Sequence, residues 1–273
     1  MDTKTKTTTI GILGYGNMGQ AIVAQLQTMK ASKMNIEIVI HSLGVSNVPG
    51  ARCVESSIDL FEASDFVFVC VKPQDFYQLK TLTIKNAKHL IVVSIMAGVR
   101  IVNIQKVFPG AKVVRVMPNL PLQIGQGVIG WYLKKDSLTS DEQAFLEKVF
   151  SVFGLSVPLQ EEKMLDALTA VSGSGPAYVF LFANALIKSA RELGFSQDVA
   201  EKIVIKAITG SIAYAVSKEH PDFERLIQMV QSKGGTTEAA LNTLDVENYY
   251  TEWQKAIKKA YERAQEISSH DSK

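Results

Sequence analysis

The chain has 273 residues, of which 47% are hydrophobic and 21% are charged. This length suits two domains of ordinary size, and the composition excludes a disordered chain. A formal net charge of +2 gives no electrostatic reason to expect nucleic acid or a membrane surface as a partner.

The cysteines, the histidines and the N-terminus carry no chemical motif. Cys53 and Cys70 lie inside apolar runs without a spacing motif, so we expect buried free thiols in a reducing compartment. The four histidines lack metal-ligand spacing, and we expect no metal. The residues from Met1 to Thr9 contain no apolar signal core, which favours a cytoplasmic location.

The chain begins with a pattern typical of dinucleotide-binding domains. The β-branched run from Thr8 to Leu13 is followed by a glycine turn and then by an apolar face of helical spacing. In such a turn one glycine permits the tight bend, one lets a pyrophosphate approach, and one allows close helix packing. We expect the whole turn to contact a cofactor; its residues are Gly14, Tyr15, Gly16, Asn17, Met18 and Gly19. The alternative is a glycine turn that binds no ligand.

The end of the second predicted strand, Ile36 to Ile40, bears on the choice of cofactor. Enzymes that use NAD usually have Asp or Glu here, where the carboxylate binds the ribose hydroxyls. This chain has His41 and Ser42, so no carboxylate repels a 2′-phosphate. We therefore expect NADP, with NAD possible, and we expect Ser42 and Arg52 to contact the phosphate.

Further apolar runs predict a parallel sheet that is covered on both faces. The predicted strands are Phe66 to Val71, Leu90 to Ile95, Val113 to Met117, Val128 to Tyr132 and Leu155 to Pro158, with a helix from Ser140 to Phe153 before the last. Ligands of such sheets bind at the carboxyl ends of the strands, although turn chemistry alone also favours glycine, proline and asparagine there. The residues expected to line the cofactor cleft are Val71, Lys72, Pro73, Ala97, Gly98, Pro118 and Asn119.

The second half is predicted to be helical and is organised around one apolar stretch. Between Pro176 and Gly194, the run from Ala177 to Ile187 is apolar on nearly every side, so it requires burial on every side. Its eleven residues are too few to span a bilayer. Helices of the same chain or of a second subunit must therefore surround it. Further helices are predicted at Ser196 to Ser217, Pro221 to Val230, Thr236 to Leu244 and Asn248 to Ser268.

One loop of this half is a candidate anion site. Ser232-Lys233-Gly234-Gly235-Thr236-Thr237 leads directly into a predicted helix, so that bare N–H groups and hydroxyls gather at the helix start. Such a site suits a carboxylate or a phosphate. A simple helix N-cap is the alternative.

Taken together, five motifs resemble the pyrroline-5-carboxylate reductase family over nearly the whole chain. They are Gly14-Tyr15-Gly16-Asn17-Met18-Gly19, Val71-Lys72-Pro73, Met117-Pro118-Asn119, Ser172-Gly173-Ser174-Gly175-Pro176-Ala177-Tyr178 and Gly234-Gly235-Thr236-Thr237. The resemblance implies an α/β Rossmann-type domain over 1–160 and an all-helical dimerisation and substrate domain over 161–273. It also implies hydride transfer from NAD(P)H to a cyclic imine in proline biosynthesis.

The resemblance implies a homodimer or an oligomer of dimers, in which the cofactor of one subunit meets the helical domain of its partner. The Thr237 hydroxyl is expected to bond the ring nitrogen and is the one predicted catalytic residue. The N–H groups of Gly234, Gly235 and Thr236 are expected to bind the substrate carboxylate, and Ser232 belongs to the same substrate loop. Positioning matters more here than a strong general acid, because a protonated imine is already a good electrophile.

Departures from the family border this loop and leave alternatives open. Lys233 stands where the family usually has proline, Gln231 replaces a small residue, and Ile227-Gln228 replaces a Lys-Asp pair. The chain could thus be a catalytically altered NADP-binding paralogue or sensor, or a reductase of another cyclic imine. A β-hydroxyacid dehydrogenase is disfavoured, because it needs a lysine within one turn of Gly175 and the first here is Lys188.

Overall fold

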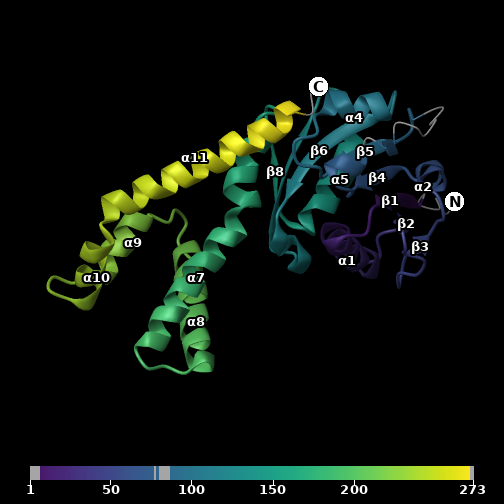
Figure 1. Ribbon diagram of the computed structural model, residues 1–273. Coiled ribbons are helices and arrows are strands. Elements are labelled where there is room, and N and C mark those ends of the chain that lie inside the picture. Colours follow the sequence, from purple (N-terminus) through teal and green to yellow (C-terminus); the bar gives the residue numbers. More distant parts are fainter. Residues whose placement is uncertain (1–6, 77, 80–86, 271–273) are drawn as a thin grey trace. The chain divides into compact units, whose positions relative to one another are not determined.

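The computed structural model describes residues 7–76, 78–79 and 87–270 (Figure 1). The chain forms two compact units: Met1–Ser174 together with Ala260–Lys273, and Gly175–Lys259. The domain boundary predicted at residue 160 lies before this division and stays a prediction. The ends of the predicted helices and strands agree with the structure to within two residues.

The first unit is built on an eight-stranded sheet in the order β3-β2-β1-β4-β5-β6-β7-β8. The strands are β1 (Thr8–Leu13), β2 (Ile36–His41), β3 (Arg52–Cys53), β4 (Phe66–Val69), β5 (Ile91–Ser94), β6 (Lys112–Pro118), β7 (Gly127–Leu133) and β8 (Gly154–Pro158). All neighbouring pairs are parallel except β6 and β7, which are antiparallel. The predicted parallel sheet is confirmed, with the pair of β6 and β7 as its antiparallel exception. The link between β6 and β7 contains only the short 3₁₀ helix η2 (Leu120–Ile124), whereas a parallel crossover needs about a dozen residues.

Helices cover both faces of this sheet, as alternating side chains require. Ile10 and Ile12 of β1 belong to one buried cluster and Leu13 to a second one. Ile38 and Val39 of β2 divide between the two clusters in the same way. The covering helices are α1 (Asn17–Ala31), α2 (Ser57–Ala63), α3 (Pro73–Phe76), α4 (Ile101–Val107), α5 (Ser140–Ser151) and α6 (Met164–Leu168).

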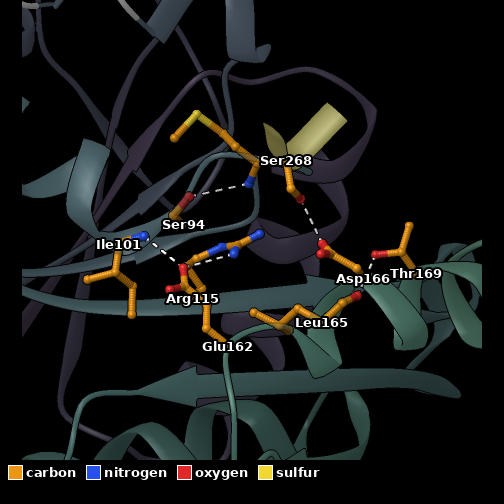
Figure 2. Close-up of polar contacts among 9 residues, drawn as sticks. Ser94, Ile101, Arg115, Glu162, Leu165, Asp166, Thr169 and Ser268 are labelled. Carbon is orange, nitrogen blue, oxygen red and sulfur yellow. Dashed lines mark hydrogen bonds and ion pairs between the residues drawn. The ribbon is translucent and has the colours of Figure 1, made fainter. Parts of the chain in front are cut away.

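A polar network of the first unit ties distant segments together (Figure 2). The Glu162 carboxylate accepts hydrogen bonds from the Arg115 guanidinium of β6 at 2.9 Å and from the Ile101 N–H of α4 at 2.8 Å. The Ser268 hydroxyl donates to Asp166 of α6 at 2.8 Å, and both residues are buried. Because buried polar groups are costly without partners, these bonds fix the last turns of α11 (Val246–His270) on this unit.

The turn after β5 packs against the same helix. Gly98 has φ +80°, and a Cβ there would collide with Ile267 of α11. Close packing against α11 therefore explains why residue 98 is a glycine. The cofactor contact expected of Ala97 and Gly98 stays a prediction.

The second unit consists of α7 (Gly175–Glu192), α8 (Gln197–Val216), α9 (Phe223–Val230), α10 (Thr236–Leu244) and the first part of α11. Within the single chain α7 has no buried residue, so the burial on every side that the sequence predicts is not found there. Its large exposed apolar side chains are Val179, Phe180, Leu181, Phe182 and Leu186.

By length and composition alone, the helical stretch Met164–Glu192 could cross a membrane. The expectation of a span that is too short concerned only the eleven residues from Ala177 to Ile187, and the helical stretch of the structure is longer than that run. A helix that is buried inside an assembly of soluble subunits passes the same test.

The capping box at the start of α5 makes the first prediction. Partial burial alone would raise the pKa of Glu142, but the hydrogen bond and charge of Lys112, at 2.6 Å, and the Thr139 N–H outweigh it. The pKa of Glu142 is therefore lowered on folding. Its contribution to stability is present above the unfolded-state pKa and is lost as pH falls through the folded-state pKa.

We expect Glu142→Gln to lower the free energy of unfolding by about 0.5 kcal/mol at pH 7, because glutamine keeps the cap but not the charge. Urea unfolding between pH 7 and pH 3 measures this, and the difference from the unmodified chain should disappear in acid. Glu147→Gln is the control, since the Glu147 carboxylate accepts from the neutral Gln143 amide. A Glu142→Gln deficit that persists at pH 3 would contradict the assignment.

Candidate cofactor cavity and substrate loop

A cavity of about 500 Å³ lies at the carboxyl ends of β1, β2 and β4. Because β1 stands between β2 and β4 in the sheet, the glycine turn after β1 lies at the middle of the cavity. Six of the predicted cofactor residues line it: Gly14, Tyr15, Gly16, Ser42, Val71 and Lys72. The other nine are not among its lining residues: Asn17, Met18, Gly19, Arg52, Pro73, Ala97, Gly98, Pro118 and Asn119.

The three glycines of the turn meet three different constraints. Gly14 has φ +94°, which side chains rarely tolerate. A Cβ on Gly19 would collide with the Gly14 carbonyl oxygen, whereas a Cβ on Gly16 would have no heavy atom within 4 Å. The space over Gly16 is therefore open for a ligand to approach the backbone, which fits a pyrophosphate. Gly16 is also the N-cap of α1 and provides no side chain to cap the helix start.

Arg52 has a partner of its own. Its Nε donates to the Glu37 carboxylate at 2.7 Å, from the neighbouring strand β2. Since Arg52 does not line the cavity, its expected contact with a phosphate stays a prediction. His41 and Ser57, to which the sequence analysis assigned no contact, also line the cavity.

Asn119 is held by the protein on both sides of its amide. Its Nδ2 donates to the carbonyl and to the hydroxyl oxygen of Ser172, both at 3.2 Å, and its Oδ1 accepts from the Val128 N–H at 2.8 Å. Ser172 belongs to the π-helical turn η3 (Thr169–Gly173), which directly precedes α7. The amide is therefore engaged in positioning this turn.

The Cys70 thiol also lines the cavity. Burial raises the pKa of Cys70 above its usual range, because desolvation disfavours the thiolate. The thiol is therefore neutral near pH 7, and it contributes shape to the cavity and no nucleophile.

The loop before α10 already uses two of the N–H groups that the sequence assigned to a ligand. The Gly234 N–H donates to the Glu238 carboxylate at 2.7 Å, and the Gly235 N–H donates to the Ser232 carbonyl at 3.0 Å. The first N–H groups of a helix have no partner within the helix, and here they belong to Thr236 and Thr237. Gly235, the N-cap, again supplies no capping side chain. These two hydrogen bonds shape the turn, and the helix start leaves the N–H groups of Thr236 and Thr237 without a partner inside the helix.

Family models match both units. The model described as pyrroline-5-carboxylate reductase dimerisation matches residues 162–267, and the model described as NADP oxidoreductase, coenzyme F420-dependent, matches residues 9–98. Curated relatives named pyrroline-5-carboxylate reductase extend over both regions. The relative from Synechocystis is 32% identical over 94% of this chain and 97% of its own length, and the one from Aquifex aeolicus is 32% identical over 96% and 98%.

Solved structures agree with this assignment. Pyrroline carboxylate reductase of Plasmodium falciparum, solved with NADP bound, has a TM-score of 0.85 and 25% identity, covering 96% of this chain and 98% of that one. The pyrroline-5-carboxylate reductase of Coxiella burnetii has a TM-score of 0.80 and 28% identity, covering 96% and 99%. The cofactor of the family is NADP, as the missing carboxylate after β2 indicated.

The two constrained glycines give the second prediction. We expect Gly16→Ala to keep its thermal stability, since its Cβ meets no atom, but to raise the Kd for NADPH about tenfold or more by occupying the approach to the pyrophosphate. Gly19→Ala should instead lose about 1–3 kcal/mol of stability, because its Cβ collides with backbone. Calorimetric melting and fluorescence titration separate the two effects. Equal changes of melting temperature and of NADPH affinity in the two variants would contradict the assignment of Gly16 to cofactor approach and of Gly19 to helix packing.

Each family model matches only one part of the chain, whereas the curated relatives match nearly all of it. The glycine turn and the loop before α10 are therefore parts of one shared architecture. This chain belongs to the pyrroline-5-carboxylate reductase family.

Proposed function

We propose that this chain catalyses the reaction after which its family is named, the reduction of pyrroline-5-carboxylate to L-proline with hydride from NADPH. The observation that carries the proposal is the match to curated relatives of that name over 94% and 96% of the chain. The cavity at the glycine turn and the uncapped start of α10 supply the two kinds of site that the reaction needs.

The first unit binds the cofactor in this proposal. NADPH supplies the hydride when it is bound. Gly14, Gly16 and the start of α1 hold the pyrophosphate, and Gly19 lets the helix pack closely enough for that. Gly98 and Asn119, which also have protein contacts of their own, are proposed cofactor contacts as well. Further proposed contacts are Tyr15, Asn17, Met18, Ser42, Arg52, Val71, Lys72, Pro73, Ala97 and Pro118.

The loop before α10 binds the substrate. Its carboxylate accepts from the N–H groups of Thr236 and Thr237, where the partial positive charge of the helix start favours an anion. Gly234, Gly235 and Ser232 keep the loop in shape through the contacts described above. The half-buried Thr237 places its hydroxyl for a hydrogen bond to the ring nitrogen. This chain thus orients a reactive imine, and no strongly acidic or basic side chain is needed.

The exposed apolar side chains of α7 and α8 support an assembly of subunits. The family model that matches this region describes dimerisation, and we propose a homodimer or an oligomer of dimers. A formal net charge of +2 favours neither nucleic acid nor a membrane as a partner. The free thiols of Cys53 and Cys70 support a reducing compartment, and we propose the cytoplasm.

Purified protein mixed with NADPH and pyrroline-5-carboxylate tests the activity directly. The absorbance of NADPH should fall only when the protein and pyrroline-5-carboxylate are both present, and L-proline should appear. A homologous six-membered cyclic imine carboxylate belongs in the same experiment, because Lys233 and Gln231 border the loop. Faster reduction of the larger ring would change the assigned substrate. NADPH binding without turnover of either imine would indicate a sensor.

The third prediction concerns Thr237. Thr237→Val keeps the shape of the side chain but removes the hydroxyl that bonds the ring nitrogen. We expect turnover to fall roughly ten- to a hundredfold, which corresponds to a hydrogen bond to a charged group, with NADPH affinity unchanged. Steady-state kinetics at saturating cofactor measure this.

A matched control lies on the same helix. The Thr243 hydroxyl donates to the Ala239 carbonyl at 2.9 Å, so Thr243→Val removes a hydroxyl that is bonded within α10. It should retain normal turnover. If Thr237→Val also retained it, the catalytic assignment of Thr237 would be wrong.

The fourth prediction concerns assembly. The unmodified chain should sediment as a dimer or as a multiple of dimers, because α7 has no buried residue within one chain. Phe180→Asp should lose this assembly, since an unpaired charge would be placed in the interface. Val102→Asp on α4, also an exposed apolar position, should assemble normally. A folded monomer of the unmodified chain would refute the proposal.

A further inference from the structure

The side chain of Glu238 joins the first turn of α10 to the loop that precedes it (Figure 1). Glu238 is the third residue of α10, and a glutamate there commonly accepts from the N–H of the N-cap residue. In this chain the N-cap is Gly235, whose N–H already donates to the Ser232 carbonyl at 3.0 Å. The half-buried Glu238 instead accepts from the Gly234 N–H, one residue earlier, at 2.7 Å.

The loop from Ser232 to Gly235 has the geometry of a type II turn. Gly234, at the third position, has φ +73°, whereas Lys233 at the second position has no positive φ. Proline is favoured at that second position, because its ring sets φ in advance. Lysine leaves φ free, and the two glycines that follow are the residues with the most backbone freedom. The bond to Glu238 is therefore a constraint that this turn needs.

The start of α10 depends on the same bond. Gly235 offers no side chain to cap the helix. Helix ends fray, because their first N–H groups have no partner within the helix. By tying the first turn to Gly234, the Glu238 carboxylate keeps the N–H groups of Thr236 and Thr237 pointing the same way. A carboxylate can accept from both only when they share one direction.

We propose that Glu238 is a positioning residue, whose bond to the Gly234 N–H holds the helix start in the shape that binds the substrate carboxylate. The inference rests on the proposed function, since it takes the loop before α10 as the site of that carboxylate. Glu238 acts through the turn and contacts neither the substrate nor the cofactor. Its bond provides the restriction that a proline at position 233 would otherwise give.

Two variants of Glu238 separate its hydrogen bond from its charge. Glu238→Ala removes the acceptor, whereas Glu238→Gln keeps an oxygen that can accept from the Gly234 N–H. We expect Glu238→Ala to raise the KM for pyrroline-5-carboxylate about five- to tenfold, which corresponds to one hydrogen bond, and to lower kcat by less than about threefold. Glu238→Gln should keep a KM within about twofold of the unmodified chain, since the turn remains tied.

Lys233→Pro tests whether the two constraints replace each other. Among the residues that the structure describes, the Lys233 N–H donates no hydrogen bond, so a proline ring would remove none. Lys233→Pro alone should change KM by less than about twofold, because Glu238 already holds the turn. Added to Glu238→Ala, it should recover most of the loss. Additive effects of the two substitutions would contradict the link between them.

A carboxylate that cannot be reduced separates binding from turnover. Cyclopentanecarboxylate has a five-membered ring and a carboxylate but no imine. Its Kd for the protein loaded with NADPH, measured by calorimetry, should rise about five- to tenfold in Glu238→Ala and stay within about twofold in Glu238→Gln. The Kd of NADPH itself should be unchanged in every variant, which also shows that each is folded.

A matched control comes from the neighbouring helix. Glu224 lies in the first turn of α9, but there the N-cap Asp222 accepts from the Arg225 N–H at 3.0 Å. Because α9 has a capping side chain of its own, Glu224→Ala should keep the KM and both Kd values of the unmodified chain. A loss equal to that of Glu238→Ala would show a general effect of removing a negative charge, and would overturn the proposal.

The remaining outcomes separate this inference from the proposed function. If neither imine is reduced but cyclopentanecarboxylate binding follows the pattern above, the proposed function fails and Glu238 still positions a carboxylate site. If an imine is reduced with the same KM in the unmodified chain and in Glu238→Ala, the function stands and the inference falls. Equal losses in Glu238→Ala and Glu238→Gln would overturn the inference too, because the bond to Gly234 would not be the cause. An unmodified chain that neither reduces an imine nor binds cyclopentanecarboxylate would refute both.

Discussion

The exposed apolar surface of the second unit is the constraint on which this structure depends. Fully burying a side chain such as Phe180 or Leu181 is worth about 1.5–3 kcal/mol, and α7 carries several such residues without burying any of them within one chain. A stability of 5–15 kcal/mol is typical of a whole domain, so leaving such a surface in water removes a large part of what folding can gain. The helical unit therefore makes sense only as half of an interface, in agreement with the dimerisation model that it matches.

An interface helix of this kind must be held at its ends. The chain leaves the first unit at Ser174 and returns at Ala260. Asn119 holds Ser172 just before the exit, and the buried pair of Ser268 and Asp166 holds α11 after the return. The pair of Ser268 and Asp166 is buried and the pair of Asn119 and Ser172 is partly buried, so both are costly to separate and demand one geometry. In the proposed enzyme they would keep the ends of both connections in place without contacting either substrate.

The sequence predicted those features that depend on local chemistry. The glycine turn, the strands around it and the start of α10 at Thr236 were found as expected, because glycine, strand and cap patterns act over a few residues. It did not predict the antiparallel β7, because β7 is as apolar as its parallel neighbours and only the short link reveals the direction.

Individual partners could not be predicted either. Nothing local in the sequence links Arg52 to Glu37, Gly98 to Ile267 or Asn119 to Ser172, since each pair is joined only by the tertiary fold. The same limit applies to the N–H groups of the loop before α10. The pattern predicted the helix start at Thr236 correctly, but only the hydrogen bonds show that Glu238 and Ser232 accept from the N–H groups of Gly234 and Gly235.

The departures of this chain from its family can be weighed against that loop geometry. Lys233 and Gln231 lie beside the turn, but the donors proposed for the substrate carboxylate are backbone N–H groups at the start of α10. Backbone donors survive side-chain replacement as long as the turn keeps its shape. That shape is set by Gly234 at φ +73° and by the contact of its N–H with Glu238, and neither position is among the departures. Changes at 231 and 233 therefore leave the backbone donors that we propose for the substrate carboxylate in place.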